Sequence, residues 1–297
     1  MFMGIAYYPE HWPRERWPVD ARLMREAHIG AARMGEFAWS RFEPREGEFD
    51  FGWMDDAIDV LAGEGVKTIM CTPTAAPTAW MIKKHPDILP VDANGLISRR
   101  FGRRRSYCCN APAYQEYTRK IVTAMAEHYG HNPNIIGWQI DNELADVYWV
   151  NRARCYCESC REKFAAWLEH KYGSLDALNR TWGTVFWSHE YIAWDEMMLP
   201  SRGTAGESSS PSHLLDFYRF HSDSWSSTPS CRLISSASRA GINGSRPTLR
   251  RARCARSSTQ RTTPCTAQAL SGSPASSTGE PSLKASTFQP GAHIWAA

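Results

Sequence analysis

The first stretch of this sequence that could do chemistry is an apolar run ending on polar groups. Residues 135–143 have the sequence IIGWQIDNE, in which the apolar run is followed by Asp141, Asn142 and Glu143. Buried strands are apolar runs of this length. A carboxylate at the end of such a strand can transfer a proton, and an amide beside it can hydrogen-bond a hydroxyl group. The alternative is structural: Asp141 or Asn142 caps a helix with Glu143 in its first turn. The spacing leaves both alternatives open.

A cluster of cysteines is the second group of residues with chemical potential. Cys155, Cys157 and Cys160 form the pattern C-x-C-x-x-C. The sequence shows no secretory signal, so three thiols within six residues indicate a metal site more than disulfides. The alternative is a set of reduced thiols without a metal. Zinc in a closed site takes four ligands, so a fourth ligand must come from elsewhere in the chain.

Alternating strand and helix patterns are expected to position these residues. The expected strands span residues 2–8, 29–39, 66–74 and 135–143. The expected helices span residues 14–28, 53–64 and 113–129, with a long loop at 75–110 and a further helix at about 214–225. This alternation predicts an α/β fold with a parallel sheet. Long loops after the strands favour a (β/α)8 barrel over an open doubly wound sheet. No glycine-rich turn follows the first strand, which disfavours dinucleotide binding.

A barrel would explain the polar end of the fourth strand. The carboxyl ends of barrel strands face the catalytic cavity. Glu143 is then a candidate general acid, and Asn142 lies where it could bond a substrate hydroxyl group.

Length and charge exclude several other classes of protein. The chain has 297 residues, enough for one large domain, and a net charge of +3,. So small a net charge argues against general attraction to nucleic acid or membranes. No apolar stretch approaches the ~20 residues that span a bilayer. We therefore expect a soluble, cytoplasmic protein with no nucleic-acid or membrane partner.

The composition changes after Trp225. The segment from Ser226 to Ala297 holds fifteen Ser and eight Arg but a single acidic residue, Glu280. Such a composition buries too little apolar surface to offset the entropy of ordering. We expect residues 226–297 to be a disordered, out-of-frame tail. Residues 1–225 would then form a partial barrel domain with an insertion at about 144–200.

Seven motifs, in this order, resemble those of glycoside hydrolase family 42, whose members are mostly β-galactosidases. The motifs are YYPEHWP (7–13), RMGEFAWSRFEPREGEFDF (33–51), PTAAPTAW (73–80), ILPVD (88–92), FGRRRSYCCN (101–110), GWQIDNE (137–143) and LDFYRF (215–220). They cover roughly the first three quarters of the chain. The resemblance implies a (β/α)8 barrel that releases terminal β-D-galactose from β-galactosides, with retention at the anomeric carbon. A nucleic-acid module built on the cysteines and the basic tail would leave these motifs unexplained.

The resemblance also implies roles for single residues. Glu143 matches the family's acid/base glutamate, and Asn142 matches the neighbour that contacts the sugar 2-hydroxyl group. Arg104 matches the arginine that holds sugar hydroxyls in the glycone subsite. Its neighbours Arg103 and Arg105 are expected to be solvated loop charges.

A fourth metal ligand follows from the same resemblance. The family has a ligand cysteine in the stretch that holds Cys108 here, while Cys109 occupies a position more often taken by proline. The implied cofactor is a structural Zn²⁺ bound by Cys108, Cys155, Cys157 and Cys160. The ion would join the loop after the fourth strand, which holds three of these cysteines, to the loop after the third strand, which holds Cys108. A closed site of four thiolates leaves no position for water activation.

The family nucleophile, a glutamate at the end of the seventh strand, has no counterpart in this chain. Four more strand–helix units would need far more than the 72 residues after Trp225, at roughly 30 residues per unit, and Glu280 follows no strand pattern. We therefore expect half a barrel with little activity. The alternative function is a non-catalytic, zinc-stabilised carbohydrate-binding fragment. Family members are usually homotrimers, which half a barrel gives no reason to expect here.

Overall fold

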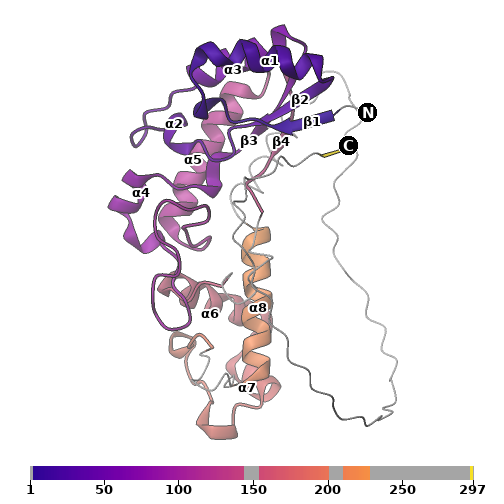
Figure 1. Ribbon diagram of the computed structural model, residues 1–297. Coiled ribbons are helices and arrows are strands. Elements are labelled where there is room, and N and C mark those ends of the chain that lie inside the picture. Colours follow the sequence, from indigo (N-terminus) through magenta and orange to yellow (C-terminus); the bar gives the residue numbers. More distant parts are fainter. Residues whose placement is uncertain (1–2, 144–153, 201–209, 228–294, 297) are drawn as a thin grey trace, which may run out of the picture.

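A sheet with four parallel strands forms the centre of the fold. The computed structural model describes residues 3–143, 154–200, 210–227 and 295–296. Its strands are β1 (Met3–Ala6), β2 (Ile29–Met34), β3 (Lys67–Cys71), β4 (Ile135–Gln139) and β5 (Trp295–Ala296). The strand order is β4-β3-β2-β1-β5 (Figure 1). The first four strands pair in parallel, while β5 pairs antiparallel with β1. The predicted parallel α/β architecture, a partial (β/α) barrel, is confirmed.

Helices follow each of the first three strands and continue beyond the fourth. The α-helices are α1 (Trp17–Glu26), α2 (Trp39–Phe42), α3 (Gly52–Gly63), α4 (Ala79–Lys84), α5 (Pro112–Tyr129), α6 (Glu158–Tyr172), α7 (Leu175–Trp182) and α8 (Pro211–Ser226). Short 3-10 turns are η1 (Pro9–His11), η2 (Arg14–Arg16), η3 (Pro73–Ala75), η4 (Pro86–Ile88), η5 (Phe186–Ser188) and η6 (Trp194–Glu196). The loop predicted at 75–110 thus contains α4 and η4.

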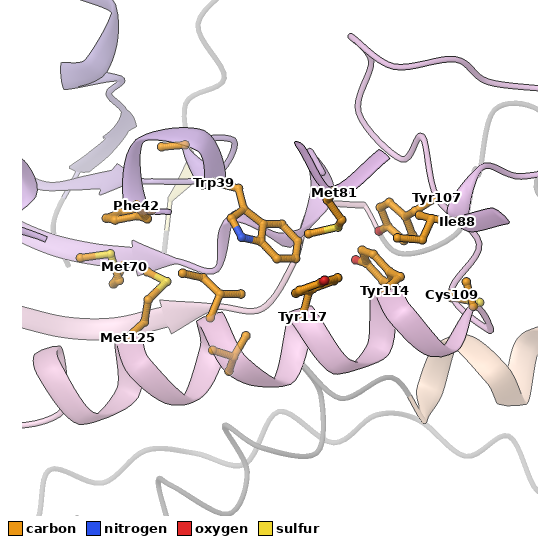
Figure 2. Close-up of a cluster of buried hydrophobic side chains, with 14 of the residues drawn as sticks. Trp39, Phe42, Met70, Met81, Ile88, Tyr107, Cys109, Tyr114, Tyr117 and Met125 are labelled. Atoms are coloured by element: carbon orange, nitrogen blue, oxygen red, sulfur yellow. The ribbon is translucent and has the colours of Figure 1, made fainter. Parts of the chain in front are cut away.

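Helix α5 shows how the sequence pattern produces burial. It begins with proline at its first position, where the missing N–H costs nothing,. Its buried positions, including Tyr114, Ile121 and Met125, recur at helical spacing,. Figure 2 shows Tyr114, Tyr117 and Met125 along α5, beside Trp39 and Met70. Tyr114 packs on Trp39 of α2, with ring centroids 6.3 Å apart. This apolar cluster holds α5 in place, and therefore also fixes where the loop from α5 to β4 begins.

Two predicted strands end earlier than expected because the backbone turns. The strand expected at 29–39 ends at Met34, and Gly35 follows with a φ of +89°. The strand expected at 135–143 ends at Gln139, and Asp141 has a φ of 57°. A left-handed residue cannot continue an extended strand. Both turns bring the residues that follow to the carboxyl edge of the sheet.

Helices α6, α7 and α8 pack into a second unit. Gly173 ends α6 in the left-handed conformation, and the Ser174 side chain caps α7 by accepting from the Ala177 N–H,. Phe217 and Phe220 of α8 each pack on Phe164 of α6 with centroids 5.4 Å apart. Figure 1 shows this unit at the end of the molecule away from α1 and α3. It contains the described part of the insertion predicted at about 144–200.

The predicted tail lies largely outside the described residues. Residues 226 and 227 still belong to the end of α8, and residues 295–296 form β5 beside β1. The expectation of a disordered tail at 226–297 concerns residues that lie almost entirely outside the described ranges, so it stays a prediction. The boundary at Trp225 likewise stays a prediction. Within the described ranges, no helix has the length and apolarity needed to cross a membrane.

The buried His213 of α8 generates a pH prediction. Its ring stacks against Trp182 and Phe164, with centroids 4.7 Å and 5.7 Å away, and Nε2 lies 3.0 Å from the Met198 backbone oxygen. That oxygen only accepts, so the ring nitrogen donates. Burial lowers the pKa of His213 to about 4.

We expect this histidine to make the fold acid-sensitive. Its folded pKa lies below the unfolded value, so its contribution is complete above about pH 6.5 and is lost as the pH falls through about 4. The free energy of unfolding should fall by about 3 kcal/mol over this range. Urea unfolding at pH 7 and pH 4 should show a smaller difference in His213→Phe than in the parent chain. The exposed His170→Gln is the matched control. An undiminished difference in His213→Phe would contradict the assignment.

Candidate active site and metal centre

The buried carboxylate of Asp141 holds the turn after β4. Asp141 is 3% exposed. Its oxygens accept hydrogen bonds from the Thr74 hydroxyl at 2.9 Å, the Tyr107 hydroxyl at 3.3 Å and the Asn142 N–H at 2.6 Å. Its own N–H donates to the Thr72 hydroxyl at 2.7 Å. Burial raises the pKa of Asp141, and these donors oppose that rise. The turn is therefore tied to the end of β3 and to the loop before α5.

Glu143 follows this turn with a half-exposed side chain. Its φ is 47°, outside the right-handed helical region,. The capping alternative, which puts Glu143 in the first turn of a helix, does not describe this backbone. The side chain is 42% exposed, so solvent or a substrate can reach it.

Two arginines converge on the Glu143 carboxylate. Arg104 Nη1 and Arg105 Nη2 lie 3.0 Å and 2.9 Å from the same oxygen, Oε2. Arg104 is half-exposed, whereas the Arg105 side chain is only 5% exposed. The expectation that Arg105 is a solvated loop charge is therefore wrong. It is buried where the loop packs near α8, and its backbone N–H donates to the Ala75 oxygen. Arg103 is exposed, as expected.

Asn142 connects Arg104 to the buried carboxylate of Glu36. In the amide orientation that satisfies both of its atoms, Nδ2 donates to Glu36 Oε1 at 2.5 Å and Oδ1 accepts from Arg104 at 3.3 Å. Glu36 is 3% exposed and also accepts from the Tyr8 hydroxyl and from Arg33, both at 2.8 Å. The structure thus brings Glu143, Asn142 and Arg104 together and adds Glu36 to the group.

Sequence reasoning did not select Glu36, although a signal was present. Glu36 follows the apolar run of β2 by two residues, much as Glu143 follows β4. The strand expected at 29–39 includes Glu36, so the sequence pattern did not reveal that Glu36 follows the end of β2 as Glu143 follows the end of β4. Gln139, the last residue of β4, also bonds Glu36, at 3.1 Å.

Four cysteines from two segments of the chain meet near the loop that carries Arg104 and Arg105. One is Cys108 and the other three lie between residues 155 and 160. The Sγ atoms of Cys108, Cys155, Cys157 and Cys160 all lie within 4.8 Å of one another. Cys108 Sγ is 3.4 Å from Cys160 Sγ and 3.6 Å from Cys157 Sγ. Cys109 is also buried but does not belong to the group. All of these cysteines are unpaired, since a disulfide needs about 2.05 Å between sulfurs,.

The geometry and surroundings of this cluster fit a tetrahedral thiolate site. With Zn–S bonds of about 2.3 Å, tetrahedral sulfurs lie about 3.8 Å apart. Backbone N–H groups of Val91 and Asn110 donate to Cys155 and Cys108 at 3.4 Å and 3.3 Å. Such donors stabilise thiolates. Hydrogen bonds among the four thiols lower the pKa of Cys155 and Cys157 and raise that of Cys108 and Cys160, so the sulfurs share their protons within the cluster.

Comparison with known proteins decides the family. The model of glycoside hydrolase family 42, described as β-galactosidase, matches residues 6–232. The chain belongs to glycoside hydrolase family 42. The family predicted from the motifs is confirmed, and members of this family are glycosidases.

Individual family 42 proteins support the assignment. A β-galactosidase of Thermus thermophilus is 50% identical over 221 residues, which are 74% of this chain and 33% of that protein. The crystal structure of a β-galactosidase from the psychrophilic Marinomonas ef1 matches with a TM-score of 0.75 at 42% identity, covering 82% of this chain and 36% of the other. A β-galactosidase of Halorubrum lacusprofundi matches with a TM-score of 0.73 at 40% identity, covering 81% and 35%. The chain spans about a third of the length of the relatives it matches.

The support of Asp141 generates a prediction about two threonines. Thr74→Val removes a hydrogen bond to a buried carboxylate, which typically costs about 1.5–3 kcal/mol,. Thr68→Val in β3 is the matched control, because the Thr68 hydroxyl is fully buried and has no hydrogen-bond partner within the described ranges. In urea unfolding, Thr74→Val should lower the free energy of unfolding, and Thr68→Val should leave it unchanged. Equal effects would show that the bond to Asp141 contributes nothing.

Proposed function

We propose that this chain carries the acid/base half of a retaining β-galactosidase site, with Glu143 as the proton donor. The observation that carries the proposal is the position of Glu143 at the carboxyl edge of the parallel sheet, bonded to Arg104 and Arg105. Carboxylates at this edge face the cavity of a (β/α) barrel. The names of the family 42 relatives supply the substrate class, a terminal β-D-galactoside.

The contacts of Glu143 suggest how it would act. Both arginines bond Oε2, so among the described contacts Oε1 is the oxygen left to carry the proton. A proton on Oε1 would pass to the glycosidic oxygen as the bond to the anomeric carbon breaks. Arg104 is half-exposed and would bond sugar hydroxyls. Asn142 is fixed by its bonds to Arg104 and Glu36 and would bond the sugar 2-hydroxyl group.

Retention requires a second carboxylate, about 5–5.5 Å from the first. Glu36 is a poor candidate, because its oxygens accept from Tyr8, Arg33 and Asn142. General acid catalysis without a nucleophile typically contributes only about 10²–10⁴-fold. We therefore propose that the chain as given hydrolyses β-galactosides negligibly. The second candidate function is a non-catalytic carbohydrate-binding fragment, which Arg104 and Asn142 would serve equally well.

Restoring a complete barrel should separate these functions. We expect the 297-residue chain to give no measurable release of nitrophenol from a nitrophenyl β-galactoside. A chimera that continues after Trp225 with the remaining part of the Thermus thermophilus relative should be active. In that chimera Glu143→Gln should lower kcat by about 10²–10⁴-fold, because the proton donor is lost. The measurement is the initial rate at saturating substrate.

The control is Glu116→Gln, an exposed carboxylate on α5. It should leave the rate of the chimera unchanged. Turnover by the 297-residue chain itself would mean that a nucleophile has been overlooked. Full activity of the Glu143→Gln chimera would refute the assignment of the acid.

We also propose that the four cysteines hold a structural Zn²⁺. Cys108 comes from the loop after β3, and the other three lie at the start of α6 or just before it. A bound ion would therefore join the loop that carries Arg104 to the α6–α8 unit. Four thiolates complete the tetrahedron, so the ion supplies stability and takes no part in the chemistry of Glu143.

Removal of one cysteine tests the metal proposal. Purified, reduced chain should contain about one zinc per molecule by elemental analysis, and Cys157→Ser should lose most of it. Unfolding of Cys157→Ser should begin at lower urea concentration because the metal-linked stability is gone. Cys71→Ser, a buried thiol of β3 outside the cluster, should retain zinc. Absence of zinc in the parent chain would end the proposal.

A further inference from the structure

A small cavity lies between the four-cysteine cluster and α8. Its wall includes Cys108 and Cys155 on the cluster side, Arg105 and Arg154 from the flanking loops, and His221 and Trp225 from α8. The cavity measures about 20 Å³. One water-sized occupant needs roughly 10–15 Å³, so the cavity has room for one small occupant and none for a sugar.

Three of the side chains that line this cavity carry buried nitrogens without a hydrogen-bond partner among the described residues. The nitrogens concerned are Arg105 Nε and Nη1, both ring nitrogens of His221, and Trp225 Nε1. Arg105 and His221 are each 5% exposed. The Cys155 backbone approaches His221 without the geometry of a hydrogen bond. Buried polar atoms nearly always have a partner. Three such side chains around one cavity indicate an occupant that accepts hydrogen bonds.

The charge around the cavity distinguishes a water from an anion. Arg105 shares its carboxylate partner Glu143 with Arg104, so two guanidinium groups meet one negative charge. Arg99 and Arg154 add positive charge to the wall, although each has contacts of its own. Cys108 and Cys155 add negative charge on one side when they are thiolates. His221 has two ring nitrogens, at least one of which carries a hydrogen that can be donated.

The number of donors also favours an anion. Arginine and tryptophan nitrogens only donate. A water molecule makes about three hydrogen bonds, some of them as a donor. A halide accepts from every side and needs no acceptor in return. We propose that this cavity binds one monatomic anion of the halide class, chloride in a cell, through the N–H groups of Arg105, Trp225 and His221.

An anion here would connect three segments of the chain. It would join the loop of Arg105, the segment of Arg154 and Cys155, and helix α8. It would also hold the guanidinium group whose other end bonds Glu143. This cavity borders Cys108, Cys155 and Arg105 but is a different site from the four-sulfur cluster and the Glu143 carboxylate. The proposal does not depend on catalytic activity.

Crystallography of the full chain with bromide tests the proposal directly. Crystals of the zinc-loaded chain grown from chloride-free gluconate and soaked in sodium bromide should show an anomalous peak in the cavity, bonded to Arg105 Nε and Trp225 Nε1. Density for a water that bromide does not replace, or an empty cavity, would overturn the proposal.

Thermal unfolding gives an independent test in solution. At constant ionic strength, replacing gluconate by chloride or bromide should raise the unfolding midpoint in a saturable way. Trp225→Phe removes one donor and keeps an aromatic ring, so it should weaken halide binding about tenfold or more. Trp167→Phe is the matched control, because its N–H bonds Asp223 away from the cavity. A peak in the crystal without this halide-dependent rise would mean an adventitious ion only. Equal halide dependence in both variants would exclude Trp225 as a ligand.

Discussion

Parallel pairing of β1 to β4 is the constraint on which the candidate site depends. Because the strands run the same way, their carboxyl ends lie at one edge of the sheet. The residues that follow the strands therefore meet although they are far apart in sequence. Tyr8, after β1, bonds Glu36, after β2, and Thr72, after β3, bonds Asp141, after β4. An antiparallel sheet of the same strands would send alternate ends to opposite edges and separate these pairs.

Residues with no proposed contact to a substrate fix the position of Glu143. Asp141 ties the β4 turn to Thr74 and Tyr107, and Tyr107 stacks on Tyr114 of α5 with centroids 3.9 Å apart. The same loop carries Arg105 two residues before Tyr107. The position of the Glu143 carboxylate therefore depends on aromatic packing along α5 as well as on its own ion pairs. The buried core and the polar edge are parts of one arrangement.

The sequence was informative where local periodicity reflects burial, and less so where a turn or a distant contact decides. The buried face of α5 follows from helical spacing, and the parallel sheet follows from alternating elements. Strand ends at Gly35 and Asp141 were missed because a left-handed residue leaves no periodic signal. Three consecutive arginines gave no sign that Arg105 is the buried one, since that depends on how the loop packs near α8. The cluster of four cysteines needed the family resemblance to supply Cys108, because no local spacing joins it to Cys155.

Charge balance explains how Arg105 can be buried within so basic a loop. The run Arg103–Arg104–Arg105 resembles a solvated patch in sequence, but two of its members face Glu143. Four thiolates around Zn²⁺, as proposed, would carry a net charge of −2 on the far side of the same loop. These charges and the anion proposed in the adjoining cavity would together put negative charge near each guanidinium group, as buried charges require. A neutral residue in place of Glu143 or of the cysteines would leave positive charge in a low-dielectric setting. The Glu143 carboxylate and the four-cysteine cluster would thus support each other through the arginines between them, although their proposed roles differ.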